Sequence, residues 1–221
     1  MRLQILSTEH WSLLASRGLA WNESFTRAGM FLSTLSFAVV ALALVGQASG
    51  FDEGFRLFAL VVLPVVLFLG IATALRLDSA NYHDALCVIG MNRIRAEYLK
   101  LAPDLEHVFV MGTTDDLEGI GLTMATTPGR GMRVAIMVAT PTLLTVLNGV
   151  LVGAIVSVAL VQLGAAQMTS LGVGAVAFVL AVAVQVWFAS RSVGRLMSGN
   201  APMYPAPAAP LAEGTPPEPH V

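Results

Sequence analysis

The chain has 221 residues, of which 56% are hydrophobic and only 12% are charged. A soluble domain usually carries roughly 25% charged residues, so this composition excludes an ordinary soluble globular protein. The net charge of −2, with no basic tract, gives no sign of nucleic acid as a partner, and the single cysteine, Cys87, excludes an intrachain disulfide.

Residues 1–27 are predicted to form an N-terminal amphipathic helix. From residue 7 onward, apolar or small residues recur at alternating steps of three and four, which places them on one helix face: Trp11, Leu14, Gly18, Trp21 and Phe25. Ser7 and Thr8 are candidates to cap the start of this helix. Two interpretations of the face stay open: it lies at the bilayer interface, or it packs on the middle of the chain.

Four stretches contain no Asp, Glu, Lys or Arg: residues 28–47, 57–75, 134–160 and 171–189. Crossing the hydrocarbon layer of a bilayer takes roughly 20 helical residues. A helix of a soluble protein would show a polar face within any such window. The sequence therefore predicts an all-α, four-span helical integral membrane protein, with a first transmembrane pair at 28–75 and a second at 134–190.

The basic residues are distributed unevenly around these spans. Eleven of the twelve precede the first span, lie between the second and third, or follow the fourth, and the exception is Arg56. Because basic residues near span ends stay in the cytoplasm, both termini and the middle loop are expected there. The excess of Arg over Lys, with many Ala, Val and Gly, is typical of a GC-rich bacterium, so the expected location is the bacterial plasma (inner) membrane.

Residues 76–133 are predicted to form a helical cytoplasmic middle loop. A helix over 78–101 continues from the second span and ends at Pro103, which cannot extend it. A turn or two of helix is expected over 104–111, and a short helix over 115–124. Asp115 and Asp116 are neighbours whose side chains diverge on a helix, so a solvated acidic turn is favoured over a metal site.

The last segment, residues 191–221, is predicted to be a disordered cytoplasmic tail. From residue 198 onward it holds seven of the eleven prolines, with Ala and few large apolar residues. Such a composition cannot recover by burial the entropy lost on ordering.

The third span carries small residues every fourth position, which form a stripe on one face: Thr145, Gly149, Gly153 and Ser157. Small residues let two helix backbones approach in lipid, and Asn148 beside the stripe and Gln185 on the fourth span can hydrogen-bond across helices. The stripe is either an oligomer seam or a packing face within one chain. Trp11, Trp21 and Trp187 are predicted to be interfacial anchors, because tryptophan favours the headgroup level.

No catalytic motif, cofactor site or paired-cysteine metal site is found, and the spans hold no charged residue of the kind that ion-coupled transporters keep there. The favoured function is a non-enzymatic membrane protein that self-associates as a scaffold, accessory or effector subunit, with the lipid bilayer and further copies of itself as partners. The alternative is a small oligomeric channel or transporter lined by Ser, Thr and Gln.

Two sequence stretches carry a resemblance to known proteins. Glu9-His10-Trp11 with Trp21-Asn22-Glu23, and Gly90-Met91-Asn92-Arg93-Ile94-Arg95, resemble a group of uncharacterised bacterial multi-pass membrane proteins. The order of amphipathic helix, two spans and cytoplasmic helix over residues 7–101 also resembles SLATT-type two-span effectors of bacterial nucleotide-signalled defence, to which this chain adds a second span pair. The resemblance implies a membrane effector and supplies no catalytic residues.

Overall fold

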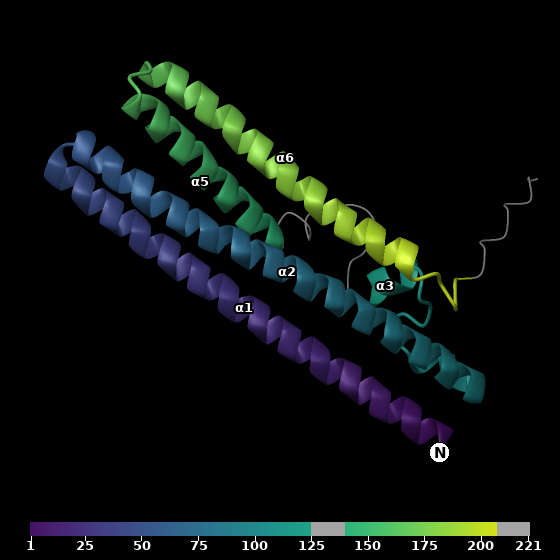
Figure 1. Ribbon diagram of the computed structural model, residues 1–221. Coiled ribbons are helices and arrows are strands. Elements are labelled where there is room, and N and C mark those ends of the chain that lie inside the picture. The colour runs from purple at the N-terminus through teal and green to yellow at the C-terminus, as the bar shows by residue number, and fades with distance from the viewer. Residues whose placement is uncertain (125–139, 207–221) are drawn as a thin grey trace, which may run out of the picture.

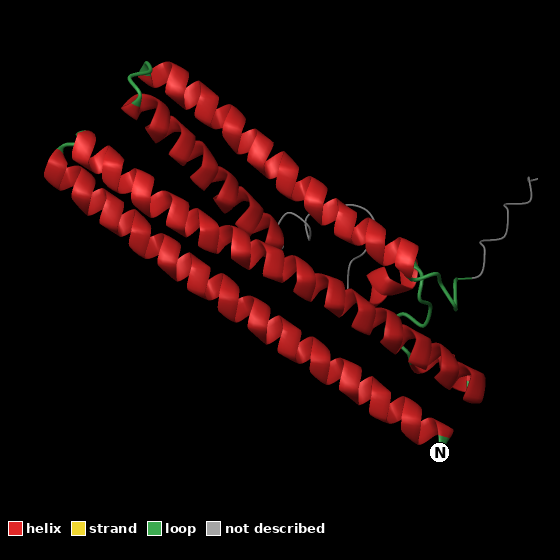
Figure 2. Cartoon of the chain, in the orientation of Figure 1, coloured by secondary structure: helices red, strands yellow, loops and turns green. Residues whose placement is uncertain are grey.

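The computed structural model describes residues 1–124 and 140–206, and every regular element in these two ranges is a helix. The elements lie side by side in one elongated bundle, with the N-terminus toward the end that also carries the short helix labelled α3 (Figure 1; Figure 2). In chain order they are α1 (Arg2–Ser49), α2 (Glu53–Leu101), the 3-10 helix η1 (Pro103–Val108), α3 (Leu117–Thr123), α5 (Thr140–Gln162) and α6 (Gln167–Gly199).

Helix α1 is continuous over 48 residues, about 72 Å at 1.5 Å per residue. The structure therefore corrects one expectation, since the helix begins at Arg2 rather than after Ser7, and residues 2–27 continue without a break into the predicted first span. No proline interrupts the chain before residue 49, and Gly18 and Gly29 are tolerated singly within a helix. The predicted first span is thus the second half of a rigid rod.

A tight turn joins α1 to α2 and makes them antiparallel. Gly50 and Phe51 both adopt a left-handed backbone conformation, with φ of 66° and 60°. The Phe51 ring lies so close to Gly46 that a Cβ on that glycine would be 2.5 Å from a ring carbon. Asp52 then starts α2 by accepting a hydrogen bond from the Phe55 N–H at 3.1 Å.

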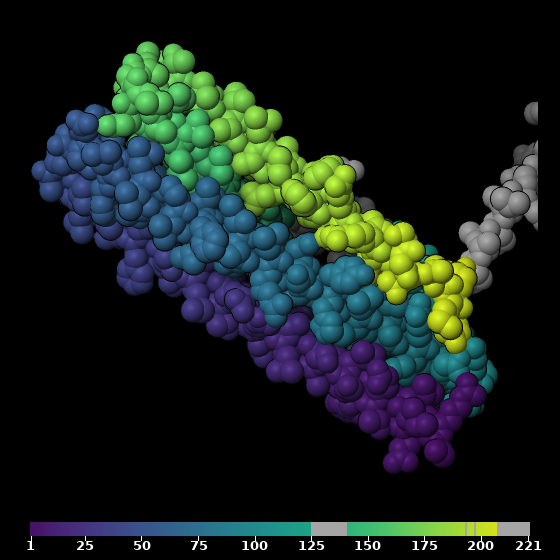
Figure 3. Space-filling view, viewed as in Figure 1, coloured from purple at the N-terminus to yellow at the C-terminus, as the bar shows by residue number. Residues whose placement is uncertain are grey.

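Helix α2 runs unbroken for 49 residues, through Pro64 and on to Leu101. The prediction of a helix over 78–101 that continues the second span and ends at Pro103 is confirmed, and η1 starts at that proline. The α1–α2 pair forms a long hairpin, visible along its whole length in the space-filling view (Figure 3).

The bundle divides into an apolar half and a charged half. The apolar half, defined by residues 28–49, 57–75, 141–162 and 167–189, belongs to four helices that are each long and apolar enough to cross a membrane. Its charge-free length on α2 is about 28 Å, close to the roughly 30 Å of a bilayer's hydrocarbon core. Its core lies where α1, α2 and α5 meet and contains Phe31, Ala38, Leu63, Val66, Leu144 and Leu151.

Polar contacts close the apolar half at both ends. At the end near the α1–α2 turn, Arg56 donates to the Gln162 side chain at 2.8 Å, and Gln162 donates to Glu53 at 3.1 Å. At the opposite end Arg76 pairs with Glu23, with a distance of 2.9 Å from Nε to Oε1. Beyond this pair lies the charged half: residues 2–27 of α1, 76–101 of α2, η1, α3, and the end of α6 with residues 200–206.

The expected disordered tail differs from the structure over residues 191–206. Helix α6 continues to Gly199. In its last turns, Leu196 packs in a second core cluster with Val88 and Ile120. Residues 200–206 follow the helix and hydrogen-bond to the middle of the chain. Residues 207–221 lie outside the described ranges, as do residues 125–139, where the third span was expected to begin.

Candidate functional site

A polar cluster in the charged half is built around Asn92, an α2 residue whose exposure is 0%. Its Nδ2 donates to the Thr114 carbonyl oxygen at 2.8 Å. Its Oδ1 accepts from Thr123 Oγ1 at 2.7 Å and from Arg95 Nη1 at 2.8 Å. Both ends of the amide are therefore satisfied, and the side chain fixes residues 112–123 against α2.

Two glycines allow this segment to fold tightly over Asn92. A Cβ on Gly112 would overlap the backbone of Gly119, and a Cβ on Gly119 would overlap the carbonyl group of Thr114. The Gly112 N–H donates to Thr123 Oγ1 at 3.0 Å, which closes the segment on itself. Larger residues at these two positions would push the backbone away from α2.

Asp115 holds the chain that follows α6. Its carboxylate accepts from the N–H groups of Met203 at 2.8 Å and Tyr204 at 2.7 Å, and pairs with Arg93 Nε at 2.7 Å. The side chain of Asp115 has 0% exposure. Burial raises the pKa of Asp115, but these hydrogen bonds outweigh burial and hold the pKa below its ordinary value. The carboxylate is therefore ionised at neutral pH.

Asp116 contributes a second attachment point. It caps α3 by accepting from the Gly119 N–H at 2.9 Å, and it accepts from the Ala206 N–H at 2.6 Å. Burial raises the pKa of Asp116, whereas hydrogen bonds from both N–H groups more than compensate and lower it. The expected solvated acidic turn is therefore wrong, because Asp115 and Asp116 precede α3 and their carboxylates bind main-chain donors of residues 203–206.

Tyr204 completes the attachment of residues 200–206, which we call the latch. Its hydroxyl donates to Glu97 Oε1 at 2.5 Å, and the Lys100 ammonium lies 4.4 Å from the centre of its ring. Hydrogen bonds from Lys100 and from Tyr204 lower the pKa of Glu97 to about 2, and Arg2 from the start of α1 also pairs with this carboxylate. The latch therefore joins α6 to both α2 and the 112–116 segment.

Asp84 ties α1 to α2 in the charged half. It is 6% exposed and accepts from the guanidinium of Arg17 and from the indole N–H of Trp21. Next to this pair, a cleft of about 450 Å³ opens between the two helices and is bordered by Ser16, Glu23, Arg76, Ser79 and His83, among others. The adjacency of His83 and Asp84 in the sequence gave no sign of this interhelical role.

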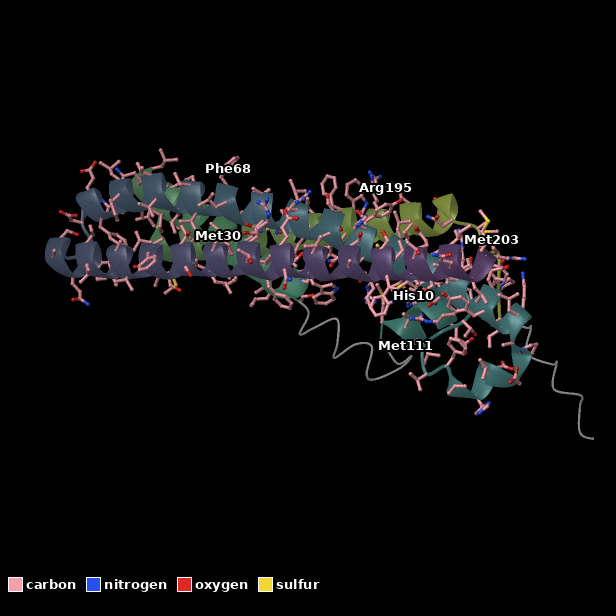
Figure 4. All side chains as sticks on the ribbon, turned by 90° about the horizontal axis from the view of Figure 1, so that it is seen from below. His10, Met30, Phe68, Met111, Arg195 and Met203 are labelled. Atoms are coloured by element: carbon pink, nitrogen blue, oxygen red, sulfur yellow. The ribbon has the colours of Figure 1, made fainter. Side chains whose placement is uncertain are left out.

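His10 is a residue of α1 and lies on the side of that helix toward the middle segment that carries Met111 (Figure 4). Burial, and then the positive charge of Arg95, lower the pKa of His10, so the ring is neutral at pH 7. Its Nδ1 is buried and has no hydrogen-bond partner. The imidazole thus lies near the positive charge of Arg95.

The polar residues predicted as a seam on the third span lie between α5 and α6. Asn148 is 0% exposed and its Nδ2 donates to Gln185 Oε1 at 3.2 Å. Gln185 in turn donates to the Thr145 carbonyl oxygen at 3.4 Å, and Ser157 donates to the Ser170 carbonyl oxygen at 3.2 Å. These side chains are therefore used in contacts between helices of one chain.

The two predicted seam glycines face the same neighbour. A Cβ on Gly149 would lie 2.7 Å from the Val182 side chain, and a Cβ on Gly153 would lie 2.8 Å from the Gly174 carbonyl oxygen. The small residues thus bring the α5 and α6 backbones into close contact. Within the chain, the stripe is occupied by α6.

The predicted anchors occupy different settings. Trp11 is 67% exposed on the charged half, whereas Trp21 lies close to the level of the Glu23–Arg76 pair. Trp187 stacks under Arg191, whose guanidinium carbon is 3.5 Å from the ring centre. Ser192, five residues after Trp187, donates to Asp78 of α2 at 2.6 Å, which places Trp187 at the same end of the apolar half as Trp21.

Within residues 1–124 and 140–206, no group of three or more His, Cys, Asp or Glu side chains is arranged to hold a metal ion. No protein-family model, curated protein or solved structure matches this chain. The arrangement of the side chains supports two roles, a fixed connection between helices and the attachment of an extended segment.

Proposed function

We propose that the chain is a non-enzymatic bacterial inner-membrane protein that self-associates and serves as a scaffold, accessory or effector subunit. The observation that carries this proposal is the placement of Asn148. A channel built on the polar residues of α5 and α6 needs them to face a water-filled path, whereas Asn148 is fully buried and bonded to Gln185. Polar side chains that hydrogen-bond between helices in this way are typical of a packed helix bundle.

The charged half supports the same proposal. Asp84, Asp115 and Asp116 are bound to an arginine or to main-chain N–H groups on another part of the chain. The Asp84–Arg17 contact fixes α1 against α2, and together these helices form a rod that extends about 39 Å beyond the charge-free stretch. A rigid projection of this length suits a protein that presents a surface to other proteins.

The proposed orientation places the charged half and both termini in the cytoplasm, because eleven of the twelve basic residues lie on that side. In a Cys87→Ala background, Ala48→Cys should react with a membrane-impermeant thiol reagent in intact cells. Asn81→Cys, on an exposed position of α2, should react only after the cells are opened. Labelling of Asn81→Cys in intact cells would place the charged half outside the cell and contradict the proposed orientation.

The scaffold and the channel are separated by ion flux through the purified protein in lipid vesicles. The scaffold predicts no selective leak above that of empty vesicles, and no change on Gln185→Leu. A selective current that disappears in the Gln185→Leu protein, while that protein still inserts and keeps its helix content, would overturn the scaffold and favour the channel. Counting fluorophores on single molecules in a bilayer tests self-association directly.

A further inference from the structure

One face of α1 in the charged half is apolar and largely exposed within the described part of the chain. It consists of Trp11, Leu14, Gly18, Trp21 and Phe25, with exposures of 67, 43, 49 and 57% for the four large side chains. A Cβ added to Gly18 would meet nothing within 4 Å, so the middle of the face is open. Among the described residues, α1 meets α2 through the adjoining side, which carries Leu13 and Arg17. Trp21, at the edge of the face, donates its indole N–H to Asp84 on α2, while its ring stays 49% exposed.

The composition of the α1 face is unusual for a helix side in water. Neither the five residues nor the flanking Ala15 and Asn22 carry a charge, whereas the exposed side of a rod in water normally does. A contiguous apolar surface of this kind marks a site of contact with protein or lipid. The length of α1 decides whether protein or lipid contacts this face.

Lipid cannot cover the whole α1 face. The charge-free stretch of α1 begins at Ala28, and Trp11 lies 17 residues earlier, which is about 26 Å along a straight helix. The headgroup layer adds only about 5–8 Å beyond the hydrocarbon on each side of a bilayer. A tilt of about 20° shortens the axial distance by less than a tenth, so Trp11 and Leu14 stand in water. Trp21 and Phe25 are near enough to reach the headgroups.

The spacing of the α1 face fits another copy of the same helix. Steps of three and four between successive members are the spacing of a coiled-coil seam, in which each side chain enters a hole on a partner helix. Two copies in one membrane share an orientation, so a two-fold axis along the membrane normal makes their α1 helices parallel. Each member of the face then meets its own counterpart, and Gly18 gives room beside the large rings of Trp21.

We propose that two copies of this chain associate in parallel through the α1 face, outside the bilayer. This inference rests on the proposed self-association. It assigns the interface between copies to α1, because α6 already covers the small-residue stripe of α5. Two heptads are a short seam, but confinement of both chains to one membrane raises their effective concentration and favours pairing.

Cysteine cross-linking in native membranes tests the α1 face with a matched control. In the Cys87→Ala background, Leu14→Cys and Gly18→Cys should each yield a disulfide-linked dimer on mild oxidation. Leu19→Cys is the control, because Leu19 is 72% exposed and adjacent to Gly18 but points about 100° away around the helix. The proposal expects several-fold more dimer at the two face positions than at Leu19. Equal yields at the three positions, or no dimer at any, would overturn it.

Charge insertion provides a second test that does not depend on cross-linking. In single-molecule counting in a bilayer, Leu14→Glu should shift the protein from dimer to monomer, and Leu19→Glu should leave it dimeric. A wild-type protein that is itself monomeric defeats both this inference and the proposed self-association. A wild-type oligomer that persists in Leu14→Glu overturns only the α1 face. Modification of Leu14→Cys by a lipid-soluble maleimide, without dimer formation, would assign the face to lipid and likewise overturn the inference.

Discussion

Asp84 on α2 and Arg17 on α1 form a forked ion pair, with distances of 2.5 Å from Nε to Oδ1 and 3.2 Å from Nη2 to Oδ2. The side chains are 8% and 20% exposed, and Trp21 adds a third hydrogen bond to the same carboxylate at 3.3 Å. The pair fixes the register between the two helices, because a shift of one residue along either would separate the partners.

The Asp84–Arg17 pair gives a prediction on stability. Asp84→Ala leaves the Arg17 guanidinium largely buried and unpaired, and we expect a loss of about 3 kcal/mol in the free energy of unfolding. The double variant Asp84→Leu with Arg17→Met should recover most of this loss. Thermal unfolding of the full chain in mild detergent provides the measurement. Glu23→Gln, at the more exposed Arg76 pair, is the control, and an equal loss there would contradict the special role of Asp84.

The latch is predicted to depend on Asp115. Asp115→Ala removes the acceptor of the Met203 and Tyr204 N–H groups and leaves Arg93 without its carboxylate, so the latch should detach from the middle segment. Hydrogen–deuterium exchange of the peptide covering residues 200–206 should become markedly faster. Glu118→Ala changes an exposed acidic residue of the same segment and should leave exchange unchanged. Slow exchange retained in Asp115→Ala would rule out this account of the latch.

The latch should also weaken in acid. The pKa values of Asp115 and Asp116 are lower in the folded protein than their ordinary value of 3.8. Their contribution to stability is therefore fully present above pH 3.8 and is lost as the pH falls through the lower values of the folded state. Amide NMR shifts of Met203 and Tyr204 in nanodiscs should be constant from pH 8 to 5 and change below about pH 4. A change centred near pH 6 would instead indicate a histidine.

Because α5 and α6 are in close contact at the glycine stripe, a larger side chain there is expected to lower the stability of the protein. Gly153→Ile places side-chain atoms against the Gly174 backbone, which cannot rotate away, so we expect a loss of about 3 kcal/mol or more in stability. Gly172→Ile is the matched control, because a Cβ there meets nothing within 4 Å. Thermal unfolding should separate the two variants while both retain the dimer. Loss of the dimer in Gly153→Ile at unchanged unfolding temperature would return the oligomer seam to α5.

The helices were predictable because length and hydropathy act locally. The charge-free stretches 28–47, 57–75 and 171–189 fall within α1, α2 and α6, and the described part of 134–160 falls within α5. The stop at Pro103 follows from the missing N–H of that residue. The short helix expected over 115–124 is found as α3, Leu117–Thr123. The start of α1 at Arg2 was missed because Ser7 and Thr8 are residues that commonly cap a helix, although nothing in the backbone before them interrupts it.

The polar cluster could not be predicted in the same way. Its members meet across long sequence separations, as when Asp115 binds the backbone of Met203 and Tyr204. A proline-rich composition indicates low burial, but it does not exclude main-chain hydrogen bonds to a buried carboxylate. In the sequence, Gly112 and Gly119 were the local indication of this cluster, because glycines often occur where two backbone segments touch. The structure shows that these two glycines do approach each other.

The latch has a consequence for the biogenesis of the protein. Asp115 precedes the third and fourth helices in the chain, while its N–H donors on Met203 and Tyr204 follow both, so these contacts close the second helix pair into a loop. During synthesis this closure must wait until residue 206 has left the ribosome. A chain that ends before residue 203 keeps the Arg93–Asp115 pair but leaves both aspartates without their main-chain donors from residues 203–206, so the second helix pair stays open until synthesis is almost complete.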